Sequence, residues 1–155
     1  MNKISNQPRH SQDLSIGKTT IITFVVAPAS DHASGLNLEE LVDLVNKNSE
    51  FNIRLVLCKD YAEAMDALIQ GKAQIGWLGP YAYHEASRSG RIEQFAIGLP
   101  KGKKTSNYQS VFIVQKDSTI TSLEKIKNSR IAIGNRHSTS GYAVPKHELA
   151  EIGIN

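Results

Sequence analysis

The chain contains 155 residues, of which 40% are hydrophobic and 21% charged, and its formal net charge is +3 at pH 7. This composition is typical of one globular domain and excludes a fibrous protein, and no stretch approaches the roughly 18 consecutive apolar residues of a membrane span. The lysines are mostly dispersed, and the densest group, Lys101, Lys103 and Lys104, has no interleaved aromatic residues, so we expect no nucleic-acid partner.

The N-terminal segment, residues 1–18, is polar and lacks the apolar core of a secretory signal, so we expect a disordered tail without an export address. A chain complete as given would therefore be cytoplasmic. Residues 19–27 are rich in isoleucine and valine and are followed by Pro28, and they predict a buried strand. Asn37 then caps a helix, because Glu40 stands three positions further on as its capping-box partner.

A second strand is predicted at residues 51–58, and it contains the single cysteine, Cys58. We expect a small buried thiol there, and one cysteine excludes an intrachain disulfide. Asp60 caps the following helix, with Glu63 in the reciprocal position, and Gly71 ends it.

A third strand is predicted at residues 73–78, and Pro80 is placed to begin a helix that runs through about residue 89. Strands separated by helices of this length need crossover connections, and crossovers join parallel strands. The sequence therefore predicts an α/β fold with a mainly parallel sheet flanked by helices.

Two more strands are predicted at residues 95–99 and 108–115, and another at residues 130–133. Between the last two, Thr121 and Glu124 predict a capping box that begins a short helix.

The last helix is predicted over residues 140–152, with a kink or a late start caused by Pro145. It begins inside the run Ser138-Thr139-Ser140, which places three hydroxyl groups where a strand leads into a helix. The first amides of a helix have no internal partner and carry partial positive charge, so such a run can hold an oxyanion. The other interpretation is a plain helix cap, although a cap needs only one of the three hydroxyls.

The common enzyme motifs do not occur. The chain has no G-x-S-x-G elbow, H-E-x-x-H pair or C-x-x-C, and its five histidines lack the spacing of metal ligands. His137 and Ser138 do not make a base and nucleophile, because adjacent side chains rarely face each other and no orienting acid is identifiable. We therefore expect no enzyme, no cofactor and no metal.

Five blocks of residues follow one another along the chain: Asp60-Tyr61-Ala62-Glu63-Ala64, residues 68–83, residues 108–114, residues 116–124 and Ser138-Thr139-Ser140-Gly141-Tyr142. In sequence and order, these blocks resemble the phosphonate ABC-transporter substrate-binding proteins. The resemblance runs from about residue 19 to residue 155. Several independent blocks in register are more specific than any single motif.

The resemblance implies a two-lobed, type II periplasmic-binding-protein fold that closes on phosphonate, phosphite, phosphate or a related small oxyanion. It also implies a non-enzymatic protein of the periplasm or cell surface, which delivers its ligand to an ABC permease. The family's anion site corresponds here to Ser138, Thr139 and Ser140, with the hydroxyl groups of Tyr61 and Tyr108. A phenol can donate a hydrogen bond to an anion without becoming charged.

Residues 19–112 are expected to form the first α/β lobe, and residues 113–155 to cross over and start a second lobe. Family members are roughly twice this length by the usual size of two lobes, so the resemblance covers an N-terminal portion and leaves the second lobe incomplete. An unpaired strand edge in such a lobe invites self-association with a second copy. The alternative is a ligand-sensing input or regulatory module of the same fold, and an enzyme on this fold comes third.

Overall fold

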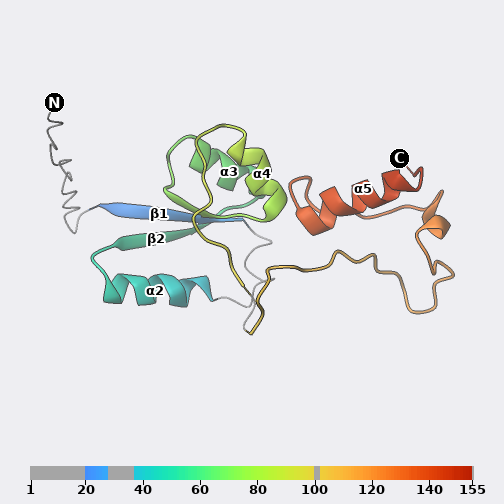
Figure 1. The fold of residues 1–155 in the computed structure, drawn as a ribbon, viewed down its shortest axis with the longest axis horizontal. Coiled ribbons are helices and arrows are strands. Elements are labelled where there is room, and N and C mark those ends of the chain that lie inside the picture. Colours follow the sequence, from blue (N-terminus) through green and yellow to red (C-terminus); the bar gives the residue numbers. More distant parts are fainter. Residues whose placement is uncertain (1–19, 28–36, 100–101, 155) are drawn as a thin grey trace, which may run out of the picture.

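The computed structural model describes residues 20–27, 37–99 and 102–154 (Figure 1). The predicted tail at residues 1–18 and the residue predicted to stop the first strand, Pro28, lie outside the described residues. The described chain forms a three-stranded sheet with helices on both sides, then a long extended stretch, and then a C-terminal helical part (Figure 1). The division into two lobes stays a prediction.

The sheet consists of β1 (Ile21–Val26), β2 (Asn52–Leu57) and β3 (Ile75–Trp77), which run parallel in the order β2-β1-β3. The central strand β1 pairs along its whole length with β2, and its last three residues pair with β3. The first three predicted strands are therefore confirmed. Branched side chains favour the extended backbone in each of them, and the intervening helices provide the crossovers that parallel pairing requires.

Three helices cover the sheet: α2 (Leu38–Asn48), α3 (Tyr61–Ile69) and α4 (Pro80–Ser87). The two predicted caps are confirmed, because the side chains of Asn37 and Asp60 accept backbone N–H groups three residues further on, at 3.2 and 2.9 Å. The N-cap of α4 is a glycine, so this helix has no side-chain cap of its own. Figure 1 shows α2 on one side of the sheet and α3 with α4 on the other.

The core lies on both sides of β1, whose side chains alternate between the two faces of the sheet. Phe24 and Val26 pack in one apolar cluster with residues of α2. Val25 and Ala27 pack in a second cluster with residues of α3 and α4, and this cluster includes Cys58. Cys58 is 6% exposed, which confirms the expected buried cysteine.

The strands predicted beyond α4 do not form. Residues 95–99, 108–115 and 130–133 pair with no other strand within the described ranges, so these three predictions are wrong. A strand needs a neighbour that takes up its N–H and C=O groups, and the sequence pattern of one segment does not supply that neighbour. Apolar side chains of these segments consequently remain in solvent, with Phe95 83% and Ile113 87% exposed.

The C-terminal part contains two short turns and one helix, η1 (Glu124–Ile126), η2 (Thr139–Ala143) and α5 (Val144–Glu151). The capping box predicted for Thr121 is wrong, because η1 is a single 3₁₀ turn and the Thr121 hydroxyl accepts a lysine ammonium at 2.9 Å. The last helix begins late, after the π turn η2, with Pro145 in its first turn. Proline fits there because the first helical N–H groups need no partner within the helix.

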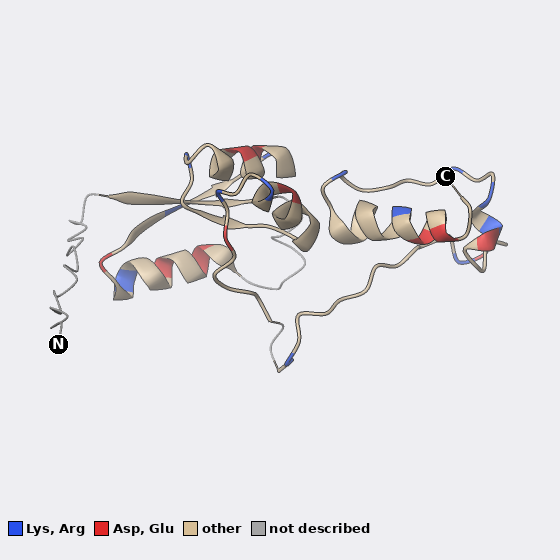
Figure 2. Cartoon of the chain, turned by 45° about the horizontal axis from the view of Figure 1, so that its top comes forward, with Lys and Arg blue, Asp and Glu red and all other residues tan. Residues whose placement is uncertain are grey.

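Charged residues are spread over both parts of the described chain, as Figure 2 shows. None of the described helices combines the length and the apolar character needed to cross a bilayer. The two parts meet at α4 and η2, where the backbone N–H of Tyr81 donates to Thr139.

Candidate binding site

Ser138 is the N-cap of the turn η2. Its backbone is extended, with φ −79° and ψ 132°, and its hydroxyl accepts the Gly141 N–H at 3.1 Å. Its carbonyl accepts the Ala143 N–H at 3.0 Å. The side chain of Ser138 therefore caps η2, and the next two residues of the run have other contacts.

Thr139 connects the C-terminal part to α4. Its hydroxyl oxygen accepts the backbone N–H of Tyr81 at 2.9 Å, across 58 residues of sequence, at a partly buried position. Because the N-cap residue of α4, Gly79, has no side chain, Thr139 supplies the acceptor that an N-cap side chain normally gives to the first turn of a helix.

Ser140 is held through its backbone. Its carbonyl accepts the hydroxyl of Ser110 at 2.7 Å, at a partly buried position. Ser110 follows Tyr108 by two residues, so this hydrogen bond keeps the segment that carries Tyr108 beside the hydroxyl run. A side-chain donor to a half-buried carbonyl contributes about 1 kcal/mol, enough to favour one placement of a segment that has no strand partner.

Two glycines, Gly134 and Gly141, allow the backbone segments before and after the hydroxyl run to pack against each other. The Gly134 N–H donates to the Gly141 carbonyl at 2.7 Å. A Cβ atom added to Gly134 would lie 3.2 Å from the Gly141 Cα, and one added to Gly141 would lie 3.0 Å from the Ser138 hydroxyl oxygen. Larger residues would therefore push the Ser138 cap out of place.

Tyr61 is the first residue of α3 and is 7% exposed. Burial raises the pKa of its hydroxyl, a hydrogen bond with the Ser138 side chain opposes this rise, and the nearby Tyr108 adds to it. A phenol whose pKa lies above the ordinary value of about 10 stays protonated at neutral pH and keeps its O–H donor.

The structure thus brings the predicted site residues into one region. Tyr61 meets Ser138, Thr139 contacts the start of α4, and Ser110 holds Ser140 in place. Tyr108 lies at the edge and is 57% exposed. Tyr61, Ser138 and Thr139 therefore lie near one another at the starts of α3 and η2 and beside the start of α4, and their side chains carry no formal charge.

Sequence reasoning missed two contacts of this region, the Ser110 hydroxyl and the Tyr81 N–H. Each joins residues 30 or 58 positions apart, a separation over which sequence periodicity carries no information. The sequence did contain one indication of the Tyr81 contact. A helix that starts with Gly79 and Pro80 has no side-chain cap and needs an acceptor from another segment for its first N–H groups.

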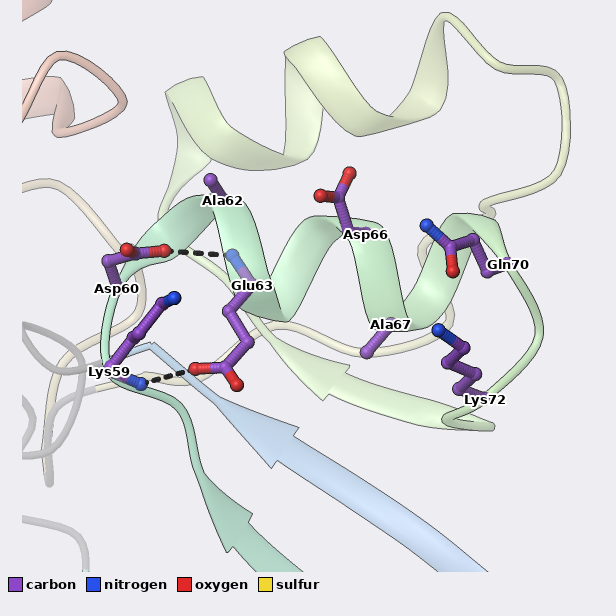
Figure 3. Close-up of a pocket in the computed structure, with 8 residues that line it drawn as sticks. All are labelled: Lys59, Asp60, Ala62, Glu63, Asp66, Ala67, Gln70 and Lys72. Carbon is purple, nitrogen blue, oxygen red and sulfur yellow. Dashed lines mark hydrogen bonds between the residues drawn. The ribbon is translucent and has the colours of Figure 1, made fainter.

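A separate hollow of about 400 Å³ runs along the exposed side of α3 (Figure 3). The carboxylate of Asp60 accepts the Glu63 N–H at 2.9 Å, and that of Glu63 accepts the Lys59 N–H at 2.7 Å. These acids cap α3, as Figure 3 shows. With Asp66 they place three carboxylates around the hollow against the two ammonium groups of Lys59 and Lys72, so the excess charge is negative and does not favour an oxyanion. No three His, Cys, Asp or Glu side chains within the described part of the chain gather closely enough to hold a metal ion.

The fold and the neutral donor groups fit a solute-binding protein, and comparison with known proteins identifies the family. The model of the family "ABC transporter, phosphonate, periplasmic substrate-binding protein" matches residues 24–155, so the chain belongs to this family. The predicted family and the type II α/β fold class are thereby confirmed.

One relative is the phosphate-import protein PhnD of Mycolicibacterium smegmatis, which is 25% identical over 137 residues, covering 86% of this chain and 42% of PhnD. A solved structure that matches is a binding protein component of an ABC phosphonate transporter from Pseudomonas aeruginosa. It is 26% identical with a TM-score of 0.66, over 87% of this chain and 46% of that protein. The chain spans less than half the length of these relatives.

Proposed function

We propose that this chain provides one side of a binding site for a small phosphorus oxyanion, such as phosphonate, phosphite or phosphate, in a solute-binding protein of an ABC transporter. The observation that carries the proposal is the meeting of Tyr61, Ser138 and Thr139 at the starts of three helical segments. Tyr108 and Ser140 complete the set of proposed ligand contacts.

Physical chemistry supports such a ligand. Backbone N–H groups at helix starts and hydroxyl groups donate to phosphate oxygens, and the helix dipoles favour negative charge there. Hydrogen bonds to an ionised acceptor are roughly twice as strong as those between neutral groups. The donors hold the anion without covalent chemistry, which fits a carrier rather than an enzyme.

The proposal includes the partners and location that the family implies. The phosphonate or phosphate would pass to a permease, and the protein would work in the periplasm or at the cell surface. A ligand-sensing module would use the same donors, so ligand binding by itself does not distinguish it from a carrier. Binding of the ligand-loaded protein to membranes that contain the permease would distinguish the carrier from the sensing module.

The experiment is a ¹H–¹⁵N NMR titration of the full chain with methylphosphonate. We expect saturable shifts of the amides of residues 138–142 and of Tyr81, with a dissociation constant on the order of millimolar. The affinity is low because donors on one side of the anion leave it open to water and do not offset its desolvation. Acetate, which lacks phosphorus, serves as the control and should bind more weakly.

Absence of shifts in residues 138–142 at saturating methylphosphonate would contradict the proposed site. Micromolar binding by a chain shown to be monomeric would contradict a different point, namely that a second set of donors is needed for tight binding. Sedimentation of the same sample establishes whether the chain that binds is a monomer.

A further inference from the structure

A second hollow, with a volume of about 490 Å³, lies between α4 and the C-terminal part of the chain. Tyr81 and Glu85 of α4 line one wall, and Arg136, Lys146 and other residues between positions 136 and 150 line the opposite wall. Figure 1 shows α4 beside the helical unit that contains α5, and α4 contacts the turn η2 directly.

This hollow adjoins the proposed oxyanion site through two residues. Tyr81, which lines the hollow, donates its N–H to Thr139 at 2.9 Å. His137, which also lines it, directly precedes Ser138. A phosphonate held by Ser138 and Thr139 would therefore have this hollow next to it, with room for the organic group bonded to phosphorus.

The charges around the hollow are mainly positive. Arg136 and Lys146 are basic side chains, and His137 and His147 add two imidazoles. The single carboxylate in the lining, that of Glu85, lies 3.9 Å from the guanidinium of an arginine outside the hollow.

The cations of the hollow have no carboxylate partner in the described ranges, where the one salt bridge joins Arg88 and Glu85. The Lys146 ammonium lies 3.4 Å from the Tyr142 hydroxyl and 5.5 Å from the centroid of its ring. These contacts hold the ammonium in position without neutralising it, because a phenol ring attracts a cation but carries no charge. An anion that enters the hollow would meet an oriented cation without first displacing a bound carboxylate.

We propose that this hollow receives the substituent on phosphorus and selects a carboxylate over an ammonium there. The preferred ligand class is therefore phosphonates that also carry a carboxylate. The inference rests on the proposed oxyanion site and adds the choice of substituent to it. A carboxylate is attracted by Arg136 and Lys146, whereas the ammonium of an aminoalkylphosphonate is repelled by the same two charges.

The test compares four probes by NMR titration of the full chain: phosphonoacetate, methylphosphonate, 2-aminoethylphosphonate and malonate. We expect phosphonoacetate to bind about tenfold more tightly than methylphosphonate, which corresponds to about 1.4 kcal/mol, and 2-aminoethylphosphonate to bind more weakly than both. Phosphonoacetate should shift the amides of His137 and Lys146 in addition to those of the hydroxyl run.

The double variant R136Q/K146Q should bring the ratio of the phosphonoacetate and methylphosphonate affinities close to one. The control variant K125Q/K127Q makes the same change in net charge at two exposed lysines that do not line the hollow, and should keep the ratio. The ¹H–¹⁵N spectra of both variants verify that they are folded.

Equal affinities for the three phosphonates, or a ratio that R136Q/K146Q leaves unchanged, would overturn the inference and leave the oxyanion site intact. Binding of phosphonoacetate and malonate at the hollow, without any binding of methylphosphonate, would overturn the oxyanion site but keep a carboxylate site at the hollow. Binding of none of the four probes would overturn both.

Discussion

Replacement of Thr139 by valine separates the two roles that its hydroxyl can have. Valine keeps the volume of the side chain but has neither the acceptor for the Tyr81 N–H nor a donor for a ligand. The lost acceptor, now at 2.9 Å from the Tyr81 nitrogen, resembles the loss of an N-cap, which costs about 1 kcal/mol of stability. The lost donor to a charged ligand should cost about 1–3 kcal/mol of binding free energy, or roughly five- to 150-fold in affinity.

The two effects are measured separately. Urea denaturation gives the free energy of unfolding, and the initial slope of the NMR shift against methylphosphonate concentration gives the relative affinity in the weak-binding range. Thr121→Val is the matched control, because its hydroxyl contacts only a lysine side chain at an exposed position. For Thr121→Val, the free energy of unfolding and the free energy of methylphosphonate binding should each stay within about 0.5 kcal/mol of the parent.

A Thr139→Val chain that loses stability but binds methylphosphonate as well as the parent would refute the reasoning. The hydroxyl would then be a cap for α4 and nothing more. A loss of affinity smaller than about fivefold also has a physical explanation. The Tyr81 N–H released by the substitution can donate to the ligand and replace part of the lost hydroxyl contact.

Two further predictions concern stability. In hydrogen exchange followed by mass spectrometry, the amides of β1 should exchange most slowly and those of residues 118–154 at least tenfold faster, because β1 is paired on both sides. Uniformly slow exchange in a monomer would show that the C-terminal part is stable by itself, while protection that increases with protein concentration would indicate self-association. Tyr61→Phe should remove a late-ionising phenol from the alkaline absorbance titration, since burial raises the pKa of Tyr61. A raised folded-state pKa stabilises the protein below about pH 10, and this contribution is lost as the pH rises above that value. The parent should therefore lose stability relative to Tyr61→Phe above pH 10, and an unchanged alkaline end of the titration would contradict the assignment.

The first part of the fold could be predicted because its signals are local. The caps at Asn37 and Asp60 indicate the starts of two helices within three residues, and the helices that follow β1 and β2 each return the chain to the parallel sheet. The strands that pair with β1 are the next two strands along the chain, each reached through one helix, so the order of elements read from the sequence already predicts the parallel pairing.

The later strands could not be predicted in the same way. Residues 108–115 contain an apolar, β-branched run at positions 111–114 that is typical of a strand, but pairing depends on a neighbour that the run does not reveal. The candidate site likewise combines local features, which the sequence predicts, with contacts between distant segments, which it does not. The run of hydroxyls and its cap at Ser138 follow from sequence, whereas the bonds from Ser110 to Ser140 and from Tyr81 to Thr139 depend on how distant segments meet.

The donor in the bond to Thr139 is a main-chain group, and this affects how the protein can diverge. Any residue except proline at position 81 supplies the same N–H, so mutations there can accumulate without breaking the connection to Thr139. Position 139 is constrained, since serine and threonine keep both the acceptor for this N–H and a neutral O–H donor. The side chain at position 81 lines the hollow, and a lineage can therefore explore new ligands by substitutions at this position while it inherits the oxyanion contacts unchanged.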